Sequence, residues 1–181
     1  TRDDVTITFE TIASTFNSLT AKADDGITIN VDLTTDVGSM FLEGDADNSA
    51  DTAVTGDRIL LSGARTLTSA GDITLDATSN TGVEADSTLD LIAINDLNIN
   101  DNVTTSGTTT ITADSDGDGN GNLIVAPTKT IDTGGSAVTI SVSDIILDGN
   151  LDVGSSELNL LVSDGGDIAL GDAIKDYNLS K

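Results

Sequence analysis

The chain of 181 residues contains no cysteine, histidine or tryptophan, and only one proline, one methionine and one tyrosine. The lack of cysteine excludes disulfides, so cysteine usage says nothing about the redox compartment. The lack of histidine and cysteine excludes nucleophile–histidine pairs and zinc sites. Aromatic residues make up 2% of the chain, so its core must consist of Ile, Leu, Val and Ala. A narrow solenoid needs less aromatic bulk than a globular sandwich or barrel.

Basic side chains are also scarce. There are 7 Lys and Arg against 31 Asp and Glu, which gives a net charge of −24. Nucleic acid is excluded as a partner, because no basic surface is present to neutralise phosphates. Such a charge repels itself and favours counter-cations, either divalent ions or a salty medium. Disorder is the alternative for an acidic chain, but 37% apolar residues in strand-like patterns argue against it.

Long apolar runs are missing as well. No run approaches the roughly 20 apolar residues of a membrane helix, so we expect no membrane insertion. The first four residues, TRDD, do not resemble a signal peptide. We interpret them as a mature terminus or as a cut within a longer polypeptide.

Short apolar runs that alternate with polar residues are present throughout. Val138, Ile140 and Val142 would point one way and Thr139 and Ser141 the other, which is the period of a half-buried strand. The runs are separated by Gly, Asp, Asn and Ser, which tolerate left-handed backbone or bond their own backbone. Further side chains that we expect to point inward are Ile73, Leu75, Leu158 and Leu160.

The acidic residues themselves favour turns. Of the 31 acids, 27 are Asp, a turn residue, and only 4 are Glu, a helix former. Strand and corner follow each other too closely for helices to fit between them. We therefore predict an all-β chain wound into stacked coils of parallel strands, and at about 20 residues per coil it makes about eight coils.

Internal matches support a repeat architecture. The segment 58–71 aligns without a gap on 122–135, at an offset of 64 that places Arg65 on Lys129. We therefore expect these two basic residues to occupy equivalent positions on stacked coils, in one column of side chains, and to pair with Asp. At an offset of 69, TLDL (88–91) matches ELNL (157–160), and the acidic residue Asp45 matches Asp114. Drifting spacing with a constant order of features is typical of stacked repeats with insertions in surface loops.

We expect three parts in the chain. Residues 1–25 form an N-terminal cap or inter-subunit segment, 26–172 form the solenoid repeats, and 173–181 form a C-terminal cap or contact segment. The first part contains Ile12, Phe16 and Leu19 at helical spacing. This spacing favours either a short helix over 11–19 as the cap or an irregular first coil.

The ends of a coil stack need partners, because their strands carry unsatisfied backbone groups. The bulky residues of the chain lie mostly near its two ends, where they would cap the stack or join copies end to end into a filament. The candidate assembly residues are Phe9, Phe16, Ile174 and Tyr177. A heterologous contact of this kind propagates into a filament instead of closing into a dimer.

Four successive segments resemble the filamentous-haemagglutinin-type repeats of giant secreted bacterial adhesins: DITLDA, TTTITADSDGDGNGNLIV, GGSAVTISVSDIILDGNLDVG and SSELNLL. The resemblance covers about residues 26–172 and implies a right-handed parallel β-helix with three strands per coil. It also implies an extracellular or cell-surface location and a structural or adhesive role. The secretion domain of that family carries Asn-Pro motifs, and none occurs here. The resemblance therefore places this chain in the rod.

The sharpest local motif is DSDGDGNGN over 114–122, which has acids at positions one, three and five and Gly at six, as in calcium loops. The candidate ligands for Ca²⁺ are Asp114, Asp116, Asp118, Asn120 and Asn122. The match is partial, because position twelve is Val125 instead of Glu and no helices flank the loop. A solvated acidic turn is the alternative interpretation.

Two other functions remain open from the sequence. A solenoid that binds carbohydrate or ice, with calcium dependence, is indicated by Thr-x-Thr pairs such as Thr66 and Thr68, although Thr is also a common outward strand residue. A polysaccharide lyase or hydrolase on a β-helix needs carboxylates or a basic residue in a cleft with sugar-binding aromatics. Aromatics are nearly absent, and Arg58 and Arg65 are the only arginines after Arg2. We therefore expect no enzyme.

Overall fold

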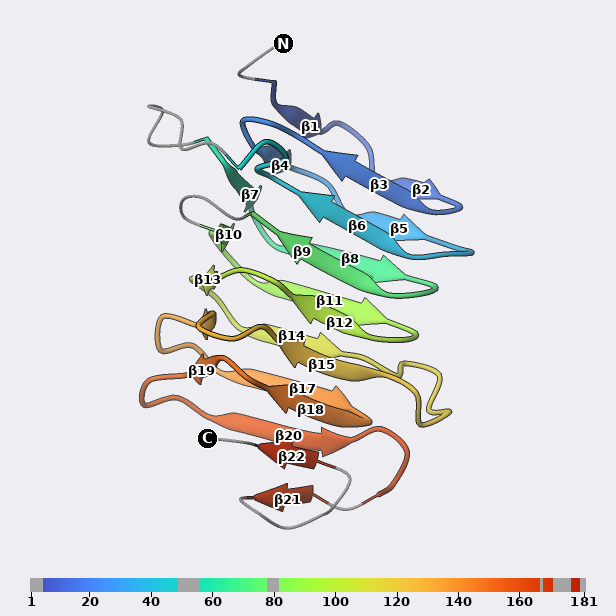
Figure 1. Cartoon of the computed structure of the whole chain (residues 1–181), viewed down its shortest axis with the longest axis vertical. Coiled ribbons are helices and arrows are strands. Elements are labelled where there is room, and N and C mark those ends of the chain that lie inside the picture. Colours follow the sequence, from blue (N-terminus) through green and yellow to red (C-terminus); the bar gives the residue numbers. More distant parts are fainter. Residues whose placement is uncertain (1–4, 49–55, 78–81, 167, 171–176, 180–181) are drawn as a thin grey trace.

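The computed structural model describes residues 5–48, 56–77, 82–166, 168–170 and 177–179, the last two ranges by their backbone alone. Within these ranges the chain forms strands and turns, and no helix. All strand pairs are parallel, and the strands build three sheets that stack along one axis as a β-solenoid (Figure 1). The predicted all-β parallel fold is confirmed, while its right-handedness stays a prediction.

The three sheets take their strands in turn from the sequence. Sheet 1 contains β1 (Ile7–Phe9), β4 (Ile27–Ile29), β7 (Arg58–Leu61), β10 (Gly82–Ala85), β13 (Val103–Thr105), β16 (Thr130–Asp132) and β19 (Asn150–Asp152). Sheet 2 contains β2 (Ser14–Phe16), β5 (Leu33–Thr35), β8 (Arg65–Ser69), β11 (Leu89–Ala93), β14 (Thr109–Thr112), β17 (Val138–Val142) and β20 (Leu158–Val162). Sheet 3 contains β3 (Leu19–Lys22), β6 (Met40–Glu43), β9 (Ile73–Asp76), β12 (Leu97–Ile99), β15 (Asn122–Val125), β18 (Asp144–Leu147), β22 (Tyr177–Leu179) and β21 (Ile168–Leu170).

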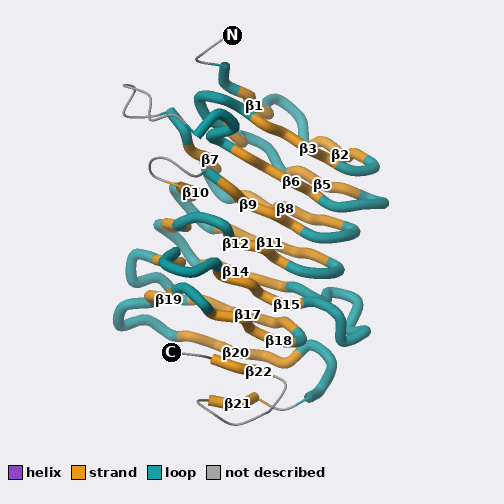
Figure 2. The backbone as a smooth tube through the Cα atoms, viewed as in Figure 1, coloured by secondary structure: helices purple, strands orange, loops and turns teal. Residues whose placement is uncertain are grey.

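Each coil contributes one strand to each sheet. The described residues form six complete coils, β1–β3 to β16–β18, followed by β19 and β20. The expected number of about eight is not confirmed, because the coils differ in length and several are longer than expected. Ile7 pairs with Ile27, whereas Ile27 pairs with Ile59, so the second coil is much longer than the first. At the described corners, Figure 2 shows loops of very different length between strands of similar length.

The core is a column of aliphatic side chains inside the three sheets. The residues predicted to point inward are almost fully buried at Ile73, Leu75, Val138, Ile140 and Val142. In each strand they alternate with more exposed residues, as the two-residue period requires. Leu158 departs from the expectation and is 37% exposed, because β20 is the last strand of sheet 2.

Of the two alternatives for residues 11–19, the short helix is wrong. In its place the chain forms β2 and β3, which lie in different sheets. Thr11 has a φ of 81°, which a right-handed helix does not accommodate, and Ile12 is 73% exposed. Phe16 and Leu19 do pack against the core, but from two successive strands. The helical spacing arose from a strand–turn–strand segment.

The first part of the chain continues the solenoid. β1, β2 and β3 pair in register with β4, β5 and β6 of the following coil. Phe9 and Phe16, two of the candidate assembly residues, pack edge to face with ring centroids 6.3 Å apart. They bring the aromatic bulk of the chain to the first coil, next to the open edges of β1 and β2.

One of the internal matches corresponds to whole coils. Leu89 and Leu158 lie in the same column of sheet 2, three coils apart, so the offset of 69 between TLDL and ELNL is a true repeat. The offset of 64 is not, because it superposes β7 of sheet 1 on β15 of sheet 3. The match of Asp45 with Asp114 likewise joins different corners, one after β6 and the other after β14.

Side chains at the corners tie each coil to the one before it. At the corner between sheets 2 and 3, the backbone N–H of Asp96 donates to Asp72 Oδ1 at 3.3 Å, and that of Asn122 donates to Asp96 Oδ1 at 2.9 Å. Asp72 N in turn donates to Ser39 Oγ at 3.0 Å. This corner ladder uses short acceptors that reach the neighbouring backbone. It gives a structural reason for the abundance of Asp.

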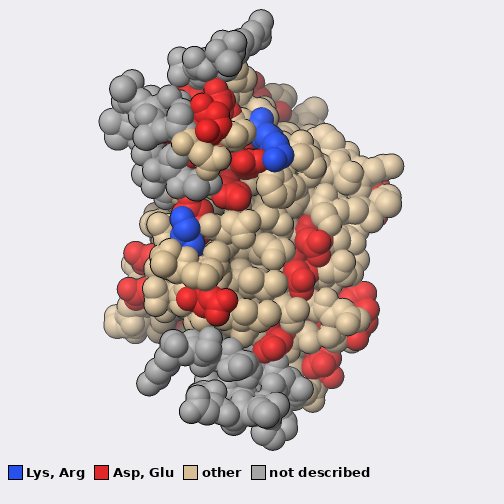
Figure 3. Space-filling model, viewed as in Figure 1, with Lys and Arg blue, Asp and Glu red and all other residues tan. Residues whose placement is uncertain are grey.

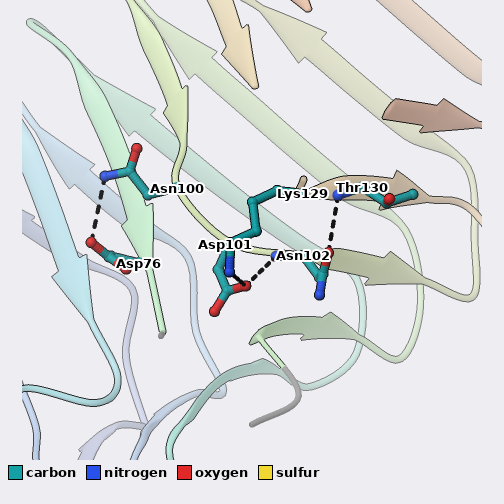
Figure 4. A network of polar contacts seen from close by, with 6 residues as sticks. All are labelled: Asp76, Asn100, Asp101, Asn102, Lys129 and Thr130. Atoms are coloured by element: carbon teal, nitrogen blue, oxygen red, sulfur yellow. Dashed lines mark hydrogen bonds and ion pairs between the residues drawn. The ribbon is translucent and has the colours of Figure 1, made fainter. Parts of the chain in front are cut away.

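The corner between sheets 3 and 1 has a similar network (Figure 4). The backbone N–H of Thr130 donates to Asn102 Oδ1 at 3.0 Å, and Lys129 Nζ lies 2.6 Å from Asp101 Oδ1. Arg65 belongs to sheet 2, and its Nη1 lies 3.8 Å from Asp32 Oδ1. Both basic residues pair with Asp, as expected, but the expectation that they share one column is wrong.

Candidate metal-binding loop

The acidic loop over 113–121 connects β14 to β15 at the corner between sheets 2 and 3. Figure 1 shows it projecting from the stack and descending beside the following coils. Ser143, directly after β17, donates its hydroxyl to the carbonyl oxygen of Gly119 at 3.0 Å. One coil further, Ser163 donates its hydroxyl to Asp114 Oδ2. The loop therefore connects three successive coils.

Asp114 is the buried anchor of the loop and is 1% exposed. Its Oδ1 accepts a hydrogen bond from the backbone N–H of Gly119 at 3.0 Å, and its Oδ2 accepts one from Ser163. Burial raises the pKa of the Asp114 carboxyl. The hydrogen bonds from Ser163 and from the backbone of the loop outweigh burial, so this pKa lies below its ordinary value of 3.8.

Glycines let the loop fold back on Asp114. A Cβ on Gly121 would lie 2.0 Å from the backbone nitrogen of Asp114, which no side chain can occupy. Gly117 and Gly119 have φ angles of +71° and +85°, in the left-handed region that favours glycine. The glycines of the motif therefore set the path of the backbone whether or not a metal binds.

The loop brings three carboxylates together. One oxygen from each of Asp114, Asp116 and Asp118 lies within 4.8 Å of the other two, and the last two side chains are exposed. Asp118 Oδ1 also accepts the backbone N–H of Asn120 at 3.0 Å. Hard cations such as Ca²⁺ prefer carboxylate and carbonyl oxygens of this kind. The donor set fits a divalent cation held at the surface.

Asn122 plays a different part from the other predicted ligands. It begins β15, and its side-chain Nδ2 donates to Asp96 Oδ1 at 3.0 Å, alongside its backbone N–H. It therefore belongs to the corner ladder. Ser163 was missed from the sequence, because it lies far along the chain from Asp114 and no local spacing connects the two.

Charge on the surface is dominated by acids, which Figure 3 shows scattered along the stack with few basic groups among them. The four basic side chains in the described ranges each lie close to a carboxylate. The pairs are Lys22 with Glu43, Arg58 with Glu84, Arg65 with Asp32, and Lys129 with Asp101. The described surface therefore offers anions no unpaired basic side chain.

The C-terminal end of the core contains an apolar cavity of about 210 Å³. Its lining comprises Leu123, Ile131, Ile140, Ile145, Leu147, Leu151, Leu158 and Leu160. Beyond it, β22 pairs with β18 and β21 pairs with β22, so that sheet 3 extends past the ends of sheets 1 and 2. Of the candidate assembly residues at this end, Tyr177 begins β22 and Ile174 lies outside the described residues.

Comparison with protein-family models, with curated proteins and with solved structures gives no significant match for this chain. A search of the described residues for a helix long and apolar enough to cross a membrane finds none.

The depressed pKa of Asp114 predicts a specific loss of stability in acid. A carboxyl whose pKa is lower in the folded state stabilises that state above its unfolded pKa and loses this contribution as the pH falls through the folded value. The pH range in which the folded state loses this stabilisation therefore extends below 3.8, the ordinary pKa of the Asp carboxyl. We expect Asp114→Asn to reduce the free energy of unfolding at pH 7. Between pH 7 and pH 3, this free energy should fall by less in the variant than in the unaltered chain, as measured by urea unfolding.

The matched control for this experiment is Asp116→Asn, which removes one charge from the exposed part of the same loop. We expect it to leave the acid dependence close to that of the unaltered chain. Identical pH profiles for the two variants would show that the buried hydrogen bonds of Asp114 do not provide the acid-sensitive contribution.

Proposed function

We propose that the chain is a segment of an extracellular structural or adhesive rod, a β-solenoid of the filamentous-haemagglutinin type. The observation that carries this proposal is the continuous in-register stacking of three parallel sheets along one axis. Such a stack is rigid, and it can be lengthened by any coil that pairs with its last strands. The role proposed is mechanical and adhesive instead of catalytic.

The extension of the rod takes place at its strand edges. Ile7 N donates to Gly26 O and Asn30 N donates to Phe9 O, so these groups of β1 face the next coil. Because successive residues of a strand alternate, the backbone groups of Thr8 face the open edge. Further coils, in a longer polypeptide or in a second copy of this chain, continue the sheets there by strand addition.

End-to-end assembly of copies is the form of this proposal for the chain as given. The partner end supplies the apolar cavity lined by residues such as Leu158 and Leu160, and the first coil supplies Phe9 and Phe16. The contact is heterologous and gives filaments. Cell-surface or carbohydrate ligands would bind along the sides of such a rod.

The test uses proline to block the edge. Thr8→Pro removes the backbone N–H that faces outward from β1, and Thr15→Pro does the same in β2, where Ser14 N and Phe16 O bond the next coil. We expect the unaltered chain to form filaments much longer than the roughly 30 Å of its own stacked coils in negative-stain microscopy. The double proline variant should stay short.

Thr8→Val with Thr15→Val is the control, because it keeps both N–H groups and should still elongate. Elongation of the proline variant would show that the edges of β1 and β2 do not make the joint. If the unaltered chain gives only short particles, end-to-end assembly of copies is ruled out. The proposal that the chain is a segment of a longer polypeptide would then remain.

We also propose that the acidic loop binds Ca²⁺ through Asp114, Asp116 and Asp118, with Asn120 as a further oxygen donor. The three converging carboxylates support this proposal. A bound cation would fix a loop that connects three coils and would offset part of the net charge of −24. Calcium then stabilises the rod without taking part in any reaction.

Calcium binding predicts a rise in stability that depends on concentration. At calcium concentrations about 100 times Kd, the free energy of unfolding should rise by about 2.7 kcal/mol, and chelation should reverse the gain. Asp116→Ala should remove the sensitivity to chelation, whereas Asp132→Ala, on the exposed face of sheet 1, should keep it. No heat of binding at millimolar calcium in titration calorimetry would rule out the site.

A further inference from the structure

The outer face of sheet 2 carries two rows of side chains that run along the stack. The first row consists of Thr15, Thr34, Thr68, Ile92, Thr112, Ser141 and Leu161, and the second of Thr66, Asp90, Thr110, Thr139 and Asn159. Eight of these 12 positions carry a hydroxyl group and one carries a charge. We refer to the two rows as the hydroxyl face.

The hydroxyl groups of this face are free to bind something outside the chain. Inward hydroxyls of the same sheet are satisfied internally: Thr35 donates to Ser69 Oγ at 2.9 Å, and Thr105 of sheet 1 bonds Thr109 at 2.8 Å. In the part of the chain that the structure describes, the side-chain hydroxyls of the hydroxyl face form no hydrogen bond. Thr110 is one example, at the centre of its row between Asp90 and Thr139.

Charged side chains are less frequent on the hydroxyl face than on the outer faces of the other two sheets. Besides Asp90 in the second row, Asp32 lies next to that row, where its Oδ1 accepts the backbone N–H of Thr66 at 3.0 Å and lies 3.8 Å from Arg65 Nη1. Outward positions of sheet 1 include Arg58, Glu84, Asp132 and Asp152, and those of sheet 3 include Lys22, Glu43, Asp76 and Asp144. Removing water from such ions is costly. On a chain of net charge −24, the hydroxyl face is the side where an uncharged partner loses least on contact.

The geometry of the face indicates what kind of uncharged partner fits. The rows repeat about every 4.8 Å from coil to coil and are separated by about 6.6 Å along each strand. Thr is β-branched and has few allowed rotamers, so its methyl and hydroxyl groups occupy few positions before binding. Figure 1 shows the strands of this sheet lying almost parallel, which keeps the grid regular.

A rigid two-dimensional grid of hydroxyl and methyl groups suits a solid whose hydrogen-bonding groups also repeat. Sugar chains are commonly gripped by aromatic side chains, and the two rows contain none. Water in ice is uncharged, donates and accepts hydrogen bonds, and is ordered in two dimensions at a crystal surface. We propose that the hydroxyl face adsorbs to ice, with the hydroxyls bonded to lattice water and the methyls in the hollows between.

This proposal goes beyond the structural role and does not require filaments, since one stack carries the whole grid. The test is partition into slowly growing ice, measured as the protein concentration in the ice relative to that in the remaining liquid. We expect the unaltered chain to be enriched in the ice. Thr110→Lys places a long charged side chain at the centre of the face. The partition of this variant into ice should fall to that of a protein that does not bind ice.

Two further variants make the test specific. Thr104→Lys introduces the same change on the outer face of sheet 1 and should partition like the unaltered chain. Asp90→Thr with Ile92→Thr leaves Asn159 and Leu161, both in the last strand, as the only positions of the two rows without a hydroxyl group, and should increase the partition into ice above that of the unaltered chain. Circular dichroism of each variant checks that the sheets are intact.

Three outcomes would overturn the proposal. The first is exclusion of the unaltered chain from ice, and the second is equal loss in Thr110→Lys and Thr104→Lys. The third is retention on insoluble cellulose or chitin, lost in Thr110→Lys, without enrichment in ice, which would assign the face to polysaccharide. Microscopy of the same samples reports on filament formation separately, so the two proposals fail independently.

Discussion

Register between neighbouring coils determines which side chains enter the core and which corner groups meet. Each strand inside a sheet pairs with the strand one coil before and one coil after it, so aliphatic side chains stack on aliphatic side chains through the core. A slip of one residue in any strand would turn its apolar side chains outward. Corner side chains such as Asp72 and Asp96 fix the same register from outside the sheets, because each accepts a hydrogen bond from one defined residue of the next coil.

The acidity of the chain follows from this arrangement. Asp provides a short acceptor at the corners and tolerates the turn backbone there, as Asp57 and Asp114 do with φ angles of 57°. Every corner that uses Asp adds negative charge, and each of the four basic side chains in the described ranges lies next to a carboxylate. A cation in the acidic loop would relieve repulsion at the point where the loop connects three coils. The acidic composition and the proposed cation site are therefore two consequences of the use of Asp at the corners.

The sequence predicts the fold well because alternation within each strand is a local signal. The two-residue period alone predicts that Val138, Ile140 and Val142 point inward, and all three are buried. The arrangement of strands into coils is harder to predict, because the three strands of one coil have similar sequence patterns. The gapless match of 58–71 with 122–135 therefore joined β7 to β15, two strands from different sheets. The carboxylates of the candidate site could be predicted from spacing, whereas the bond from Ser163 to Asp114 depends on coil lengths that no local pattern encodes.

The most direct test of the account is a set of distances along one outward column of sheet 1. Register places Thr8, Thr104, Asp132 and Asp152 in this column, and the chain has no cysteine to interfere with labelling. Spin labels at Thr8→Cys and at each of the other three positions, measured in pairs by pulsed electron paramagnetic resonance, should give distances near 19, 24 and 29 Å, rising by about 4.8 Å per coil. Distances that do not increase in this order would contradict the stacked register.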